Sequence, residues 1–127
     1  MIKFKHKEDE MLFAKLHPIL IMIFADMYNY AYEKHNILLT VTQTISTKEQ
    51  DLKLGRKSSS HREKRAIDIR TRDLDGKIID DLISYVNNKW AYKNYHYSST
   101  SGQKRLAYWH VGTAGHIHLA IHSRYKL

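Results

Sequence analysis

The segment His116-Ile-His-Leu-Ala-Ile-His122 carries the clearest pattern in the chain. Side chains in a β-strand point alternately to the two faces of the sheet. The alternating Ile and Leu residues would therefore lie on one face and suit a hydrophobic core. The three histidines would lie on the opposite face, beside a small alanine. This pattern indicates either the lining of a site or the solvated face of an edge strand, and the segment alone leaves both open.

A second distinctive segment covers residues 59–68, Ser-Ser-His-Arg-Glu-Lys-Arg-Ala-Ile-Asp. Asp68 lies within an alternating, strand-like stretch over residues 65–70, where a lone buried carboxylate is costly, so we expect a cation beside it. His61 lies seven residues earlier. Because seven is odd, the two side chains share a site only if His61 lies in the preceding loop. Two imidazoles and one carboxylate, with water at the fourth position, form a common catalytic zinc arrangement.

The order of these motifs resembles the zinc peptidases that cleave bonds to D-amino acids in peptidoglycan. They comprise the D-alanyl-D-alanine carboxypeptidases and dipeptidases, the phage L-alanyl-D-glutamate endolysins and related murein endopeptidases, and they share a fold with lysostaphin-like enzymes and hedgehog. The resemblance spans roughly residues 16–122. Its parts are Leu16-His17-Pro18 before a helix, Val41-Thr-Gln-Thr-Ile-Ser-Thr-Lys-Glu-Gln50, His61, Arg65-Ala-Ile-Asp-Ile69 and a His-x-His that ends at His118.

The resemblance implies specific roles for individual residues. His61, Asp68 and His118 would bind one zinc ion per chain. Ser59 would form a hydrogen bond behind these ligands. His116, the first histidine of His-x-His, would act beside the metal as an acid–base group or as a stabiliser of the transition state.

Two positions depart from the family pattern. Many members carry a glutamate base three residues before the last ligand, where this chain has Gly115, and no acidic residue follows Asp81. A histidine would have to replace that base, and the ordinary histidine pKa of about 6.5 suits the task. His116 is the first candidate. His110 is the second, because a turn over residues 112–115 would bring it back beside His116.

The second departure concerns the family arginine that binds substrate or developing oxyanion charge. Ser46 stands at that position in this chain, and Arg65 and Arg70 are the remaining candidates for the substrate-binding role. The missing glutamate and arginine leave an alternative open: a catalytically impaired binding or structural module of the same fold.

The patterns predict an α+β fold and a single small domain over residues 1–127. We expect an antiparallel sheet of about four strands with helices packed on one side, as in hedgehog and the D-Ala-D-Ala peptidases. Residues 1–36 would form an N-terminal helical part, and residues 37–123 the core that carries the metal site. The expected strands cover residues 38–44, 65–70, 104–111 and 116–122. The expected helices cover residues 8–34, with a break at His17-Pro18, then 46–54, beginning with a capping box at Ser46, and 76–88. Residues 87–102 read as an irregular loop.

Composition narrows the function further. The chain has no cysteine, which excludes disulfides, thiolate zinc sites and a cysteine nucleophile. Its 21 Lys and Arg against 13 Asp and Glu give a net charge of +8. The excess lies entirely in residues 55–127 and favours a polyanionic partner. Peptidoglycan or another anionic wall polymer is the preferred partner. A basic nucleic-acid-binding protein is the alternative, although the sequence shows no helix-turn-helix, zinc finger or RNP motif.

The N-terminal region shows neither a signal peptide nor a membrane span. Glu8, Asp9 and Glu10 interrupt the apolar region that a signal peptide needs. The most apolar run, residues 18–25, is far shorter than the roughly 20 residues of a transmembrane helix. We therefore expect cytoplasmic synthesis. The family resemblance implies an endolysin-like bacteriophage metallopeptidase. It would reach the cell wall through a holin or within a virion, and hydrolyse an amide bond in the murein stem peptide or cross-link.

Overall fold

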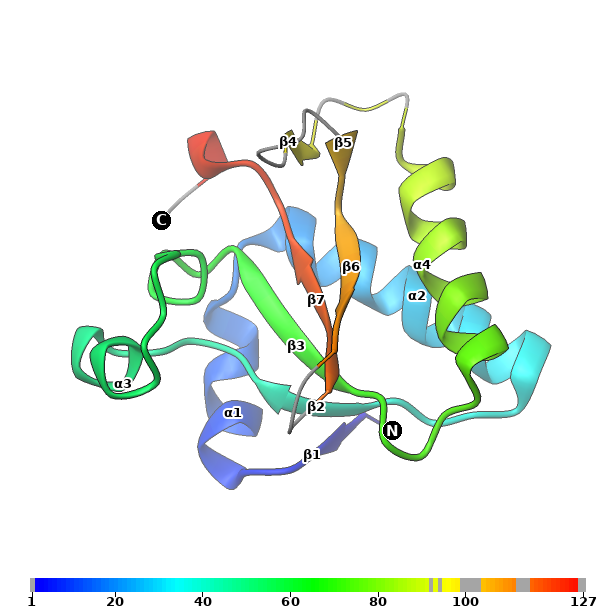
Figure 1. The fold of residues 1–127 in the computed structure, drawn as a ribbon, viewed down its shortest axis with the longest axis horizontal. Coiled ribbons are helices and arrows are strands. Elements are labelled where there is room, and N and C mark those ends of the chain that lie inside the picture. Colours follow the sequence, from blue (N-terminus) through cyan, green and yellow to red (C-terminus); the bar gives the residue numbers. More distant parts are fainter. Residues whose placement is uncertain (1, 92, 94, 99–103, 112–114, 126–127) are drawn as a thin grey trace.

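The computed structural model describes residues 2–91, 93, 95–98, 104–111 and 115–125. It shows a small α+β fold around a five-stranded sheet with the strand order β1-β2-β3-β7-β6 (Figure 1). The helices are α1 Lys7–Leu12, α2 Pro18–His35, α3 Lys48–Lys53 and α4 Gly76–Lys89, with short 3-10 turns at Phe13–Lys15 and Ser123–Tyr125. The strands are β1 Lys3–Phe4, β2 Thr40–Gln43, β3 Ala66–Arg70, β4 Tyr97–Ser98, β5 Lys104–Arg105, β6 Ala107–His110 and β7 His116–Ala120.

The sheet is mixed rather than purely antiparallel. Strands β2, β3, β7 and β6 pair antiparallel, as expected, but β1 adds a parallel edge beside β2. The expected strand over residues 104–111 is divided in two: β6 joins the main sheet, whereas β5 pairs with β4 in a separate two-stranded sheet. The α+β class is confirmed, and the predicted strand number and strand directions are matched only roughly.

Helices α2 and α4 lie side by side against one face of the main sheet (Figure 1). They bury their apolar stripes against the apolar positions of β3 and β7 in one continuous core. Its strand side chains include Ile67, Ile69, Ile117 and Leu119, all with no exposed surface. Strand alternation therefore turns Asp68 and the histidines of β7 to the opposite face.

The helix boundaries follow local signals. Helix α2 begins at Pro18, and the Nδ1 atom of His17 accepts a hydrogen bond from the Ile19 N–H (3.1 Å), as an N-cap does. The capping box of α3 is formed by Thr47 and Gln50, one residue later than predicted, and Ser46 is buried instead. Within the described residues, no helix is both long enough and apolar enough to cross a membrane.

Two predictions on loops have different outcomes. The segment predicted as irregular, residues 87–102, contains the end of α4 and all of β4. Of the predicted turn over residues 112–115, only Gly115 lies among the described residues.

Candidate metal centre

Two rows of side chains cross the sheet on the face opposite the core. The first row runs from β3 through β7 to β6, because the register places Asp68 opposite His118 and His118 opposite Tyr108. The rings of His118 and Tyr108 lie 5.2 Å apart. Asp68 and His118 therefore lie on one face of the sheet, and their atoms meet: His118 Nδ1 lies 3.0 Å from Asp68 Oδ1.

The second row lies two residues further along the same strands. It places Arg70 opposite His116 and His116 opposite His110. The two imidazoles are stacked, with ring centroids 4.9 Å apart. The prediction that His110 returns beside His116 is confirmed. His116 Nε2 also lies 3.7 Å from Asp68 Oδ1, so this row borders the first.

His61 reaches the same point from a loop, as the odd spacing to Asp68 requires. It lies in the turn over residues 60–64, is 3% exposed, and places Nε2 3.1 Å from Asp68 Oδ1. Its Nδ1 atom lies 2.7 Å from the carbonyl oxygen of Thr44. Because a carbonyl oxygen only accepts, Nδ1 must carry the proton and donate it. The lone pair of His61 is then on Nε2, which faces the carboxylate.

These three residues can hold a metal ion. The donor atoms of His61, Asp68 and His118 all lie within 4.8 Å of one another. In tetrahedral zinc sites, ligand distances of about 2.0–2.1 Å put neighbouring donors about 3.3 Å apart. The two imidazole–carboxylate separations, 3.0 and 3.1 Å, are close to that spacing. Among the described residues, His61 Nε2 is buried and has no hydrogen-bond partner, so its lone pair is available to a cation.

The electrostatics of the site favour the protonation states that a metal needs. Burial raises the pKa of Asp68, but the hydrogen bond with His118 and the close approach of His61 outweigh burial and hold this pKa well below its usual range. Burial lowers the pKa of His118, and the neighbouring Asp68 opposes this shift only in part. The ionised carboxylate of Asp68 and the neutral imidazole that this shift favours at His118 match the protonation states that ligands of a divalent cation need.

Three predicted residues have other partners. Ser59 Oγ donates to Glu63 (2.9 Å) rather than to a metal-site residue, and the Thr44 carbonyl orients His61 instead. Arg65 is bound to Glu63 (2.7 Å) and to the carbonyl oxygen of Ile121 (3.0 Å), a structural arrangement.

Ser46 is the third predicted site residue that has another partner. It is 4% exposed, and its Oγ donates to Asp51 (2.7 Å). The hydrogen bonds of Ser59, Arg65 and Ser46 therefore do not support their predicted roles.

Arg70 lies beside the metal group, whereas His122 lies away from it. Arg70 lies in the second row beside His116, and its nearest acidic partner, Asp73, is 4.0 Å away. His122 lies beyond the end of β7 and is not one of the three residues of the metal group. Its Nδ1 atom accepts a hydrogen bond from the Arg124 N–H.

Sequence reasoning missed two residues at the site. Arg56, in the loop after α3, lies with Nη2 3.5 Å from Asp68 Oδ2. A loop residue obeys no periodicity, so its sequence position carried no signal. Tyr108 was predictable, because it alternates with Trp109 on a strand whose His110 was already expected beside His116.

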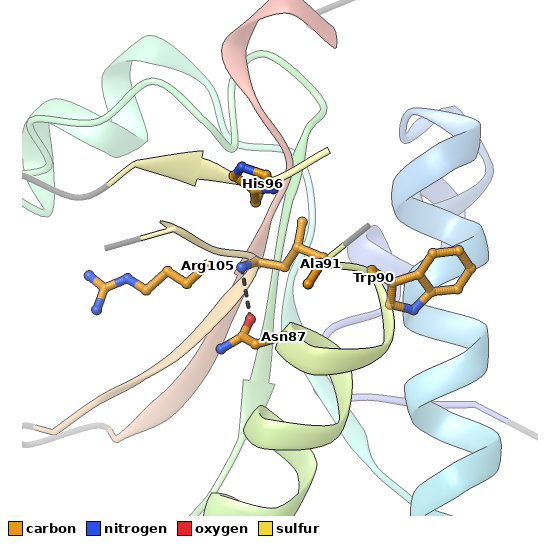
Figure 2. Close-up of a pocket in the computed structure, with 6 residues that line it drawn as sticks. Asn87, Trp90, Ala91, His96 and Arg105 are labelled. Atoms are coloured by element: carbon orange, nitrogen blue, oxygen red, sulfur yellow. Dashed lines mark hydrogen bonds between the residues drawn. The ribbon is translucent and has the colours of Figure 1, made fainter. Parts of the chain in front are cut away.

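A small cavity of about 70 Å³ lies apart from this group, between the end of α4 and strand β5 (Figure 2). Its lining residues are Asn87, Trp90, Ala91, His96, Arg105 and Leu106. The Asn87 side chain accepts hydrogen bonds from the backbone N–H groups of Leu106 and Ala107. This contact fixes β6 to α4 and gives the cavity wall a structural role.

Comparison with known proteins adds no relative. No family model, no curated protein and no solved structure matches the chain.

Proposed function

We propose that this chain is a zinc-dependent peptidase of the hedgehog/D-Ala-D-Ala peptidase type that hydrolyses an amide bond in the stem peptide or cross-link of peptidoglycan. One observation carries the proposal. His61 is held by a backbone carbonyl in the tautomer that directs a buried lone pair at Asp68, where His118 Nδ1 also converges. These three residues are also the ones that the family resemblance assigns to the metal.

The donor set suits catalytic zinc rather than a closed structural site. Two histidines and one carboxylate leave a coordination position open. Bound zinc would supply Lewis-acid polarisation of the scissile carbonyl and would activate a water near neutral pH.

His116 is the best placed acid–base group. Its side chain is 23% exposed, more than those of the three metal-site residues, and it lies on the same face within 3.7 Å of Asp68 Oδ1. A substrate that approaches the triad from solvent would therefore meet this imidazole. Its imidazole would take the proton of the attacking water and then deliver a proton to the leaving amine.

The charge of the chain supports an anionic polymer as the substrate. The net charge of +8 comes entirely from residues 55–127, the part that contains all three metal-site residues. An excess of positive charge around a cleavage site raises the local concentration of a polyanion.

The proposal is tested by metal content followed by a cell-wall digest. Plasma mass spectrometry on the zinc-reconstituted protein should give about one zinc per chain. His61→Ala and His118→Ala should lose the zinc, and the matched control His122→Ala should keep it. The wild-type protein should then release new amino termini from purified murein, identified by mass spectrometry of the fragments.

Other outcomes would point elsewhere. Wild-type protein that holds no zinc after reconstitution would overturn the proposal of a zinc peptidase. Zinc retention without any new amino terminus would indicate a binding or structural module of the same fold. Salt-sensitive binding to DNA in a protein that holds no metal would favour the nucleic-acid alternative.

A further inference from the structure

The two oxygens of Asp68 have different surroundings. Oδ1 faces the imidazoles, with His118 Nδ1 at 3.0 Å and His61 Nε2 at 3.1 Å. Oδ2 faces the guanidinium of Arg56, whose Nη2 lies 3.5 Å away. The carboxylate is 5% exposed, so this division occurs where solvent screens little.

Arg56 is itself held in place from its other side. Its Nη1 lies 3.2 Å from Asp51 Oδ1, and its Nη2 donates to Gln43 Oε1. Asp51 is 2% exposed and accepts a further hydrogen bond from Ser46 Oγ (2.7 Å). The guanidinium is therefore fixed between two buried carboxylates, Asp51 and Asp68.

This arrangement needs an arginine. A guanidinium offers several N–H donors in a rigid planar fork, so a single side chain can serve Asp51 with one nitrogen and Asp68 with the other. A lysine ammonium is a point charge and cannot meet both carboxylates in this way. The helix α3 carries Asp51, which gives this short helix a role at the site.

We propose that Arg56 is a positioning residue that retains Oδ2 of Asp68 and so restricts this carboxylate to a single metal-binding oxygen. The inference rests on the metal centre of the proposed function. A carboxylate without such a partner can turn both oxygens to a metal, which would fill the position that a catalytic site must leave open. Groups that hydrogen-bond or pair with a ligating carboxylate are a known means of tuning metal sites.

Cobalt(II) is a suitable probe, because its visible absorption is intense when four-coordinate and much weaker when five-coordinate. We would titrate wild type, Arg56→Gln, Arg56→Lys and Arg62→Gln with Co²⁺. Arg62 is the matched control, since its Nε lies 3.6 Å from Asp51 Oδ2 but it makes no ion pair with Asp68. Circular dichroism would verify the fold of each variant.

The expected result is the intense four-coordinate band in wild type and Arg62→Gln, and its loss to a weaker five-coordinate band in Arg56→Gln. Arg56→Lys should shift in the same direction, which keeps the test decisive should the glutamine variant unfold. Identical spectra in wild type, the folded Arg56 variants and Arg62→Gln would overturn the inference while leaving the metal centre intact. Wild type that takes up no Co²⁺ would overturn both the metal centre and the role of Arg56.

Discussion

His61 is oriented by a backbone carbonyl rather than by another side chain. The Thr44 carbonyl oxygen lies 2.7 Å from His61 Nδ1 and fixes which ring nitrogen faces Asp68. Such a partner leaves no trace in residue type, whereas the family resemblance implied a hydrogen bond from Ser59 behind the ligands. The correct tautomer depends instead on how the end of β2 meets the loop over residues 60–64.

Replacement of His116 would separate metal binding from the proposed catalysis. His116 borders Asp68 at 3.7 Å but is not one of the three residues whose donor atoms converge. We predict that His116→Ala keeps about one zinc per chain, as measured by plasma mass spectrometry. We expect kcat on murein fragments to fall by about 10²- to 10⁴-fold, the usual contribution of a general acid–base group.

His110→Ala is the control for this prediction, because His110 stacks on His116 without contact to the carboxylate. A smaller loss of kcat is expected for it. Loss of zinc in His116→Ala would make His116 a ligand, and a larger effect in His110→Ala would exchange the two roles.

At the level of secondary-structure elements, the end of α3 determines where Arg56 lies. Gly55 has a φ of 69°, in the left-handed region, and the following Arg56 N–H bonds back to the Asp51 carbonyl oxygen at 2.9 Å. This is a glycine-terminated helix end. Arg56 is thereby turned back toward Asp68.

Gly55→Ala should therefore affect both the helix end and the metal site. No atom lies close enough to clash with the added Cβ, so the cost comes from the backbone conformation alone. We expect about 1 kcal/mol of lost stability in urea unfolding. We also expect the Co²⁺ spectrum to move toward that of Arg56→Gln. Unchanged stability and an unchanged spectrum would show that the left-handed turn has no such role.

Helices α2 and α4 are joined by two matching polar contacts. Tyr30 of α2 and Tyr85 of α4 stack with centroids 3.7 Å apart. Tyr30 donates to Asp81 of α4 (2.7 Å), and Tyr85 donates to Asp26 of α2 (3.0 Å). Each helix thus supplies one phenol and one carboxylate, which fixes the relative position of the two helices.

Asp81 makes this helix contact sensitive to acid. Hydrogen bonds from His35 and Tyr30, together with the hydrogen bond and charge of Lys34, lower the pKa of Asp81 to about 2 against the opposing effect of burial. The folded-state pKa lies below the unfolded value of about 3.9, so the stabilisation is complete above about pH 4 and is lost as the pH falls toward 2. The side chain is 31% exposed, and solvent screening limits the contribution to about 1 kcal/mol.

We predict that Asp81→Asn lowers the free energy of unfolding at pH 7 by about 1 kcal/mol. The difference between variant and wild type should shrink as the pH falls from about 4 to 2. Urea titrations across this range measure it. A difference that is constant with pH would show that the carboxylate charge is not responsible.

Periodicity accounts for which elements were predictable. The strands β3 and β7 and the helices α2 and α4 show clear alternation or apolar stripes, and their predicted positions match within a few residues. The two-residue strand β1 is too short for any period and forms only through its parallel pairing with β2. At the site, the same rule put His116 and His118 on one face of their strand, and the family resemblance joined Asp68 to His118. The sequence did not predict Arg56 at the site, because its position depends on a helix end and a buried ion pair.

At the scale of the whole molecule, the uneven charge would govern how the protein meets the anionic wall polymer of the proposed function. All of the net charge of +8 lies in residues 55–127. We predict that binding to purified murein sacculi, measured by co-sedimentation, weakens strongly when NaCl rises from about 0.05 to 0.5 M, because salt screens exposed charges. Binding that is independent of salt would exclude charge as the main attraction.

The metal centre also connects segments that are distant in the sequence. His61 comes from a loop, Asp68 from β3, and His118 lies 50 residues beyond Asp68 on β7. The unfolded chain does not bring these donors together, so a metal ion held by them would bind the folded state preferentially and would stabilise it by mass action. At free zinc about 100 times the dissociation constant, this stabilisation is about 2.7 kcal/mol.

For a chain of this size, that stabilisation corresponds to a rise in Tm on the order of 10 °C, measurable by differential scanning calorimetry. We predict that zinc raises Tm, that EDTA reverses the rise, and that His118→Ala abolishes the response while His122→Ala retains it. The comparison isolates the site, because weak zinc binding by other histidines would act on both variants. An equal response in both variants would place the zinc elsewhere on the chain. No response in wild type would mean that the three donors converge without binding zinc.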